Sequence, residues 1–127
     1  MASSRAIDPA LMDQLVDLTN RQNELRKHVM QLTQQLASGD RERAVTTLTL
    51  RELEGLGAET KTYKAIGKAY VLEDQKELKK ELEKEKESSA VRDKDRLKLR
   101  DQFVDKLKGS EKQSQELAAQ ISKVLKQ

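Results

Sequence analysis

The chain has 127 residues, enough for one domain, and 37% of them are charged while only 2% are aromatic. Because aromatic side chains supply much of the buried area of a compact core, this composition argues against a compact monomer and favours long helices or coiled coils. The 25 basic and 22 acidic residues nearly balance, so the net charge of +3 does not by itself indicate a nucleic-acid partner.

An N-terminal coiled-coil helix is predicted over residues 8–40. Asp8 can cap the free backbone N–H groups, and Pro9 suits the first helical position. Behind them, apolar residues recur at alternating steps of four and three, which is the seam of a coiled coil. The seam positions are Leu11, Leu15, Leu18, Gln22, Leu25, Val29, Leu32 and Leu36. The polar member, Gln22, either fixes the register or leaves a loose layer. Ser38-Gly39-Asp40 predicts that the helix ends between residues 38 and 44.

A first strand is predicted over residues 44–48, which are rich in β-branched side chains. Thr49 and Glu52 then have the spacing of a capping box, which predicts the start of a short helix. Gly57 suits the left-handed residue that would end this helix.

A second strand is predicted over residues 62–72, with Gly67 marking a bulge or a close backbone approach. Residues 44–72 would thus form a β-hairpin with a short helix between its strands. Two strands alone are marginally stable in water, and their unpaired edges attract other strands. We therefore expect these strands to pair with strands of neighbouring subunits. The expected assembly residues are Val45, Thr47, Leu48, Tyr63, Ile66, Gly67, Tyr70 and Leu72.

A C-terminal coiled-coil helix is predicted over residues 74–127, because Asp74 and Glu77 have the spacing of a helix start. Its charged first half is either an electrostatic docking surface or a solvated helix face. Leu78 and Leu82 begin a seam that polar residues interrupt, and later apolar residues fit a shifted register, which predicts a stutter. Those later residues are Ala90, Leu97, Val104, Leu107 and Ile121. Gly109 weakens the helix by roughly 1 kcal/mol relative to alanine.

The residues that carry chemistry in enzymes are scarce. Without cysteine, disulfides and thiolate chemistry are excluded, and the single histidine, His28, is expected to be a partly exposed helix residue. The five glycines are scattered and form no phosphate loop. Apolar runs stay below the roughly 18 residues of a membrane span, and no secretory signal is present. We expect a soluble intracellular protein that is not an enzyme, with no catalytic residues, cofactor or metal and no nucleic-acid or membrane partner.

The central segment TLRELEGLGAETKTYKAIGKAYVLEDQKELKKELEK resembles that of the β-type prefoldin subunits. The resemblance is strong over residues 44–85 and rests on layout and heptads over the rest. Its most specific residues are Thr62-Tyr63, Ile66-Gly67 and Tyr70-Val71-Leu72. It implies a mainly α fold, with residues 1–127 as a single subunit. Two long antiparallel coiled-coil helices are joined by a β-hairpin that assembles into a multi-subunit β-barrel body.

The resemblance also implies a function, which we state as an expectation. The chain would join two α-type and three further β-type subunits in a heterohexamer. That complex holds unfolded actin and tubulin at its coiled-coil tips without ATP and passes them to the cytosolic chaperonin. The location would be cytoplasmic, with a nuclear role left open. A dimerisation or tethering coiled coil is the alternative function.

Arm ends expose seam residues wherever one helix outruns its partner, so client contacts are expected there. The candidates are Ile7, Leu11, Met12, Leu15, Leu117, Ile121, Val124 and Leu125. In the other interpretation, these residues only close the coiled coil.

Overall fold

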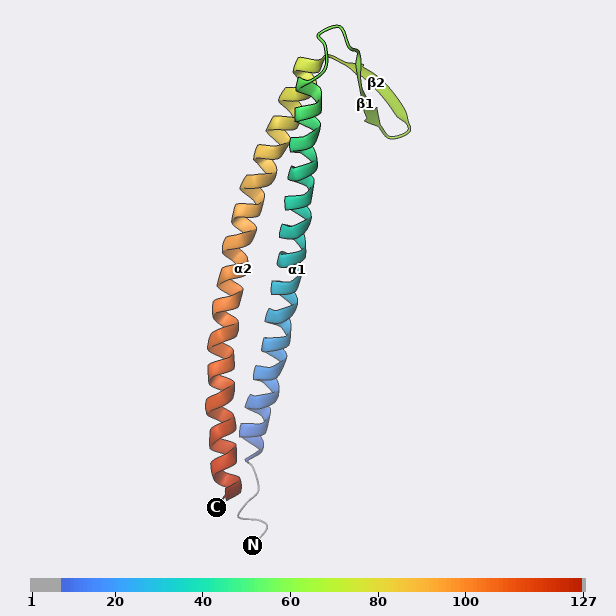
Figure 1. Ribbon diagram of the computed structural model, residues 1–127. Helices are drawn as coiled ribbons and strands as arrows, with labels where there is room; N and C mark the ends of the chain where they lie inside the picture. The colour runs from blue at the N-terminus through green and yellow to red at the C-terminus, as the bar shows by residue number, and fades with distance from the viewer. Residues whose placement is uncertain (1–7, 127) are drawn as a thin grey trace. The chain divides into compact units, whose positions relative to one another are not determined.

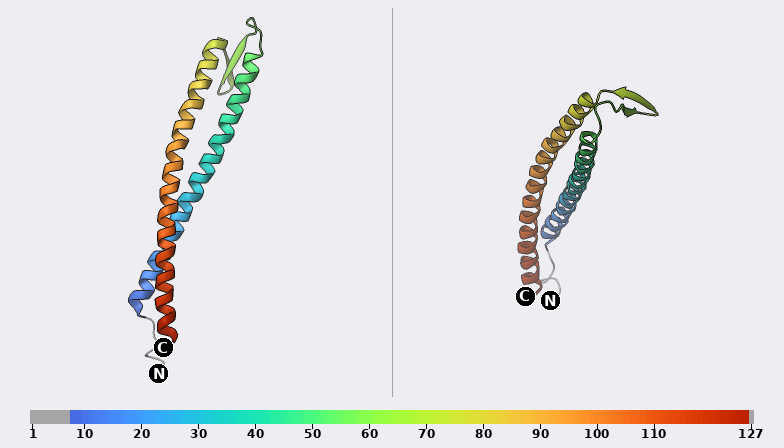
Figure 2. Two further views of the ribbon diagram at one scale, coloured as in Figure 1. Left: turned by 60° about the vertical axis from the view of Figure 1, so that its left-hand side comes forward. Right: turned by 45° about the horizontal axis from the view of Figure 1, so that its top comes forward.

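The computed structural model describes residues 8–126, and in this range the chain forms a helix, two strands and a second helix (Figure 1). The elements are α1 (Pro9–Glu54), β1 (Thr62–Ile66), β2 (Ala69–Glu73) and α2 (Gln75–Lys126). They divide into two compact units, one made of the residues up to Thr33 and from Leu97 onward, the other of Gln34–Arg96. Within each unit α1 and α2 run in opposite directions (Figure 2). The predicted fold, two long antiparallel helices joined by a hairpin, is confirmed.

Both helices bury one narrow stripe of side chains. In the unit that holds the chain ends, Leu32 and Leu117 are buried. In the unit Gln34–Arg96, Leu53 is buried and Leu36, Leu50 and Leu82 are half-buried. The predicted cap also forms, because the Ala10 N–H donates to the Asp8 carboxylate at 3.0 Å. No large side chain of the described residues is fully buried, so the core is only this stripe.

The end of α1 corrects the sequence prediction. Residues 44–48 are helical rather than a strand, and no short helix lies between the strands, because α1 continues to Glu54. The hydroxyl groups of Thr46, Thr47 and Thr49 donate to the backbone carbonyls four residues earlier, so these β-branched residues remain within the helix. The heptad steps also continue past Leu36 to Leu53. Burial of the leucines outweighs the weak strand propensity.

The hairpin is also shorter than predicted and lies within one segment of the chain. β1 and β2 are antiparallel, with Thr62 opposite Glu73 and Ile66 opposite Ala69, and no bulge interrupts them. The residue predicted as a bulge, Gly67, instead occupies the two-residue turn, with φ of 60°. A positive φ at the first turn position alone is the pattern of a type II′ turn, which glycine suits best.

The second helix needs no stutter. Its buried or half-buried positions keep heptad spacing through polar side chains, whereas Leu97 and Ala90 are exposed. These positions are Lys79, Leu82, Lys86, Ser89, Asp93, Arg96, Arg100, Phe103, Leu107, Ser110, Ser114, Leu117, Ile121 and Val124. The predicted register shift was wrong because the apolar residues at 90–99 were assumed to lie in the seam. Gly109 does not break α2.

Two glycines give matched substitutions with opposite expected effects. A Cβ added at Gly67 or at Gly109 meets no atom within 4 Å, so only the backbone conformation distinguishes them. We expect Gly67→Ala to cost about 1–2 kcal/mol because alanine disfavours the left-handed region. Amide hydrogen exchange in residues 62–73 should then rise about five- to thirtyfold. Gly109→Ala should leave that exchange unchanged and stabilise α2 by up to about 1 kcal/mol. Equal effects of the two substitutions would contradict the turn assignment.

Candidate functional site

One face of the hairpin is apolar and uncovered. The strand register places Tyr63 opposite Leu72 and Ala65 opposite Tyr70, so these four side chains share a face. Tyr63, Leu72 and Tyr70 are 56%, 58% and 77% exposed. We call Tyr63, Ala65, Tyr70 and Leu72 the hairpin face. Exposed aromatic groups at this density mark an interaction surface rather than a solvated strand.

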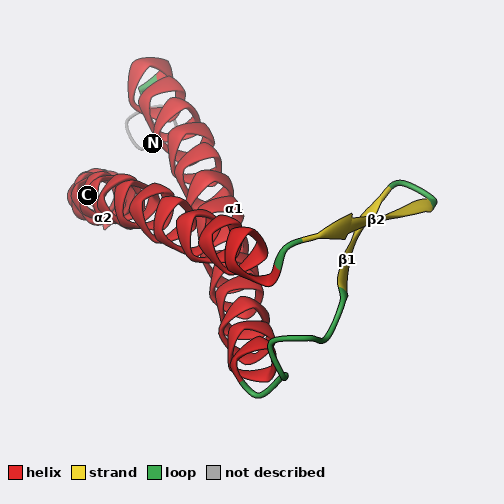
Figure 3. Ribbon diagram, turned by 90° about the horizontal axis from the view of Figure 1, so that it is seen from above, coloured by secondary structure: helices red, strands yellow, loops and turns green. Residues whose placement is uncertain are grey.

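The opposite face of the hairpin is anchored to the start of α2. The Lys64 ammonium contacts the Glu81 carboxylate at 2.8 Å, and this hydrogen bond raises the pKa of Lys64 and lowers that of Glu81. The Thr62 hydroxyl donates to the Glu73 carbonyl at 2.6 Å. In the preceding loop, the Gln75 amide donates to the carbonyls of Gly57 and Thr60. Of these bonds, Lys64–Glu81 links a strand to α2, and the hairpin projects away from the helices (Figure 3).

The structure does not bring all the predicted assembly residues together. Val45 and Leu48 lie on α1, exposed, rather than on a strand, and the Thr47 hydroxyl bonds within the helix. Ile66 lies on the face of Lys64, opposite to the hairpin face. Tyr63, Tyr70 and Leu72 do converge. Val45 and Leu48 lie on α1 because this helix extends to Glu54, whereas their strand propensity had predicted a strand.

The predicted client-contact residues lie at the free ends of the helices, except Ile7, which is outside the described residues. Leu117 is buried, and Leu11, Leu15, Ile121 and Val124 are half-buried, so these five belong to the seam. Met12 and Leu125 are 40% and 52% exposed. Of the predicted set within the described range, these two offer the largest free apolar surface.

An open apolar groove lies farther along the same unit. His28 stacks on Phe103 with ring centroids 5.0 Å apart, and Lys106 lies over the Phe103 ring. The groove is lined by Leu18, Leu25, His28, Phe103, Lys106 and Gly109, among others. Beside it, the buried Gln22 amide donates to the Ser110 carbonyl at 3.1 Å. The sequence identified Gln22 as a seam residue but gave no sign of its partner.

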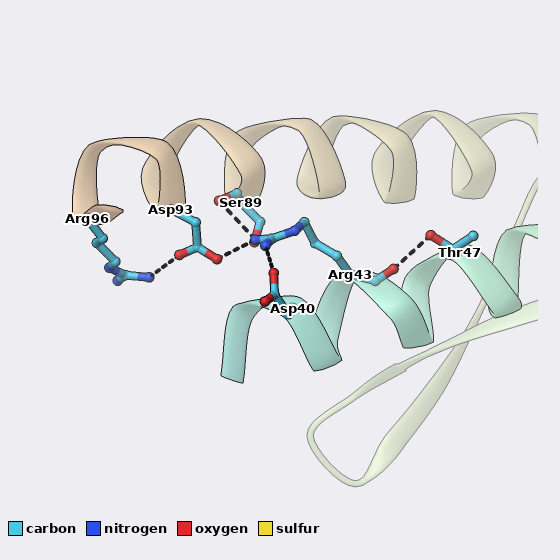
Figure 4. A network of polar contacts seen from close by, with 6 residues as sticks. All are labelled: Asp40, Arg43, Thr47, Ser89, Asp93 and Arg96. Carbon is cyan, nitrogen blue, oxygen red and sulfur yellow. Dashed lines mark hydrogen bonds and ion pairs between the residues drawn. The ribbon is translucent and has the colours of Figure 1, made fainter. Parts of the chain in front are cut away.

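A second feature that the sequence analysis missed is a polar layer in the seam of the unit Gln34–Arg96 (Figure 4). Arg43 donates to the carboxylates of Asp93 and Asp40 and to the Ser89 hydroxyl, and Arg96 donates to Asp93 at 3.0 Å. The Asp93 side chain is only 6% exposed. We define the polar layer as Gly39, Arg43, Ser89, Asp93 and Arg96. The indication of this layer in the sequence was that Gly39 and Arg43 continue the heptad spacing of the leucine seam.

Electrostatics inside the polar layer follow from these contacts. The hydrogen bond from Arg43 lowers the pKa of Asp93, against the opposing effect of burial, and Arg96 reinforces it. The same bond raises the pKa of Arg43. Both groups are therefore ionised at neutral pH, and neither is poised to exchange protons.

Neither a metal-binding cluster nor a membrane-spanning helix is found within residues 8–126. No group of three or more histidine, cysteine, aspartate or glutamate side chains within residues 8–126 is arranged to hold a metal ion. None of the helices over that same range is long and apolar enough to cross a membrane.

A pair of antiparallel helices that carries an uncovered apolar hairpin defines a coiled-coil assembly subunit. The family model described as "Prefoldin subunit" matches residues 16–127. The chain belongs to the prefoldin subunit family, and the resemblance found in its central segment is confirmed. Members of this family are non-enzymatic chaperone subunits that form oligomeric complexes with other prefoldin subunits.

Two relatives support this placement. The chain is 48% identical over 48 residues to the probable prefoldin subunit 1 of Dictyostelium discoideum, a stretch that covers 38% of this chain and 40% of that protein. The crystal structure of the prefoldin beta subunit from Thermococcus strain KS-1 is similar in fold, with a TM-score of 0.68 and 23% identity. That similarity covers 97% of this chain and 98% of the other.

The lowered pKa of Asp93 predicts a loss of stability in acid. A carboxyl group whose pKa is lower in the folded than in the unfolded state contributes stability above its unfolded pKa. That contribution is lost as the pH falls below the unfolded value of about 3.9 and through the lower folded value. We expect Asp93→Asn to be less stable at neutral pH and to lose less stability over this window, measured by urea unfolding at several pH values. Asp95→Asn, at an exposed site two residues along α2, is the control and should follow the unmodified protein. Identical pH profiles for Asp93→Asn and the unmodified protein would contradict this.

Proposed function

We propose that this chain is a β-type subunit of a heterohexameric prefoldin. In that complex it would join two α-type and three further β-type subunits, hold unfolded actin and tubulin without ATP, and deliver them to the cytosolic chaperonin. The proposed location is the cytoplasm, with a nuclear role left open. Family membership supports the chaperone role, and the hairpin face supports the assembly.

The hairpin face is the observation that carries the proposal. A two-stranded hairpin has too little buried area to be stable by itself, and its edges have unpaired backbone groups. Here Tyr70 is more than three-quarters exposed, and the Lys64–Glu81 ion pair lies on the opposite face of the hairpin. Strands of neighbouring subunits would cover that face and pair with its edges, which fits a β-barrel body shared by several chains.

Client binding is proposed at the free helix ends, at Met12 and Leu125. Unfolded polypeptides expose apolar side chains, and a holding site offers exposed apolar groups without burying the client deeply enough to prevent release. Methionine is adaptable to many apolar partners because its side chain is flexible and polarisable. The half-buried seam residues beside them, such as Leu15 and Ile121, would contribute if the ends open.

The alternative, a dimerisation or tethering coiled coil, explains the heptads but gives the hairpin face no role. Native mass spectrometry of the endogenous complex separates the two functions. Five other small helical subunits in a hexamer support prefoldin, whereas a clean homodimer supports the tether.

Assembly should depend on the hairpin face. We expect Tyr70→Lys to weaken incorporation into the hexamer about thirtyfold or more, because a charge replaces a central aromatic contact. Mixing with the other five subunits followed by native mass spectrometry gives the assembled fraction. Met30→Lys places the same charge at a similarly exposed apolar site on α1, 63% exposed, and should assemble normally. If the two variants assemble equally well, the hairpin face is not the assembly surface.

Client holding should depend on the exposed apolar groups at the helix ends. Because burying part of each side chain contributes about 1 kcal/mol, Met12→Lys combined with Leu125→Lys should weaken suppression of actin aggregation about fivefold or more. The paired control is Met30→Lys with Leu99→Lys, at exposed apolar positions away from the ends. Deleting residues 111–127 is a poorer test because it also removes Leu117, which is buried in the seam. Unchanged suppression in an intact hexamer would remove these two residues from the client site.

A further inference from the structure

The polar layer places a charged pair within the helix seam, where burying charge is costly. Leu36 and Leu53 lie on either side of Gly39 and Arg43 along α1, and every step between the seam residues fits the heptad. Desolvating an ion pair offsets most of its attraction, and well-packed apolar residues in its place are often at least as stable. Stability therefore does not account for Arg43 and Asp93 at these positions.

We propose that the polar layer determines pairing specificity. It commits α1 to α2 in one register and excludes pairing of α1 with another α1. Such control is needed because leucine seams are poorly selective, since one leucine layer packs against another in any heptad register. In an assembly of several similar coiled-coil subunits, unselective seams would pair with the wrong helix.

Charge excludes the neighbouring registers. The seam positions of α2 one heptad before and after Asp93 are Lys86 and Arg100, both half-buried. Sliding α2 by one heptad in either direction therefore brings a cation opposite Arg43 in place of Asp93. Like charges at partly buried positions repel, and the Arg43 guanidinium would lose the Asp93 carboxylate and keep only the exposed Asp40.

The close packing of Gly39 against Asp93 also excludes the registers shifted by one heptad. A Cβ added at Gly39 would lie 2.0 Å from the Asp93 carboxylate oxygen, so this carboxylate occupies space that only glycine leaves free. Gly39 is the sole glycine between Pro9 and Glu54. One heptad away, the seam residues of α1 are Leu32 and Thr46, whose side chains would fill the place of the carboxylate.

Pairing of α1 with a second α1 is excluded by the same residues. The seam of α1 from Leu11 to Leu53 has no acidic side chain. In any such pair Arg43 would keep only the exposed Asp40 of its own helix as a carboxylate partner, and a seam charge that has lost its buried partner is unfavourable. Only α2, with Asp93, supplies the complement.

Disulfide trapping in the full-length chain tests the proposal, and it does not depend on any client. The chain has no cysteine, so introduced cysteines are the only thiols. His28 and Phe103 stack in the native register, so His28→Cys with Phe103→Cys reports that register. His28→Cys with Ser110→Cys reports a slip of one heptad. A chain that carries His28→Cys alone can form a disulfide only with a second copy, so its disulfide-linked dimer reports pairing of α1 with α1.

The decisive variant replaces the ion pair by apolar residues of similar shape, Arg43→Met with Asp93→Leu. We expect it to stay helical while slipped and interchain disulfides rise about tenfold or more over the unmodified seam. Arg26→Met with Glu111→Leu, at a half-exposed ion pair 3.6 Å long, is the matched control and should leave the disulfide pattern unchanged. An unchanged pattern in the Arg43–Asp93 variant would overturn the proposal.

A second variant keeps the test decisive if the first fails to fold. Arg43→Gln with Asp93→Asn retains a polar layer of similar size without its charges. We expect slipped and interchain disulfides to rise here as well, measured against helicity by circular dichroism. If this neutral layer keeps the native register as strictly as the charged one, charge is not the selecting property and the proposal is wrong.

Discussion

The rest of the structure depends on the burial of one heptad stripe between antiparallel α1 and α2. Leu32, Leu53 and Leu117 are the apolar side chains of residues 8–126 that become buried, and no large side chain is fully enclosed. This burial keeps α1 helical through its threonines and sets where the helices end. The ends of the helices in turn fix the start of the hairpin, whose second strand leads directly into α2. A chain with such a thin core has little apolar surface of its own to cover the hairpin face.

The buried stripe contains both leucines and charged side chains, and the two kinds have different roles. The leucines supply most of the favourable burial but accept many partners and registers. Arg43 and Asp93 contribute little net stability, yet their complement exists at only one place on the opposite helix. Gly39 lowers the intrinsic stability of α1 and at the same time makes room for the Asp93 carboxylate. A residue that looked like a helix end in the sequence is thus a point of close contact between the helices.

The hairpin face and the helix ends are exposed in different structural settings. The hairpin face is exposed, and the ion pair between Lys64 and Glu81 links the other face to α2. Met12 and Leu125 are exposed because they lie beside the stripe at its end, where few neighbours remain. The proposed assembly surface is thus attached to α2, whereas the proposed holding surface lies at the free helix ends.

The sequence alone determined the features that depend on local chemistry or on strict periodicity. It predicted the Asp8 cap, the leucine seam up to Leu36, the two helices and the presence of a hairpin around Tyr63 and Tyr70, because capping and heptads are set by neighbouring residues. Only the tertiary structure shows that residues 44–54 are helical, that Gly67 occupies the turn, and that polar side chains continue the seam of α2. β-Branched residues and threonines are compatible with either a strand or a helix, and the burial of Leu50 and Leu53 by α2 selected the helix. Likewise, a polar residue belongs to a seam only when the opposite helix supplies its partner, and no local pattern in the sequence shows which residue that is.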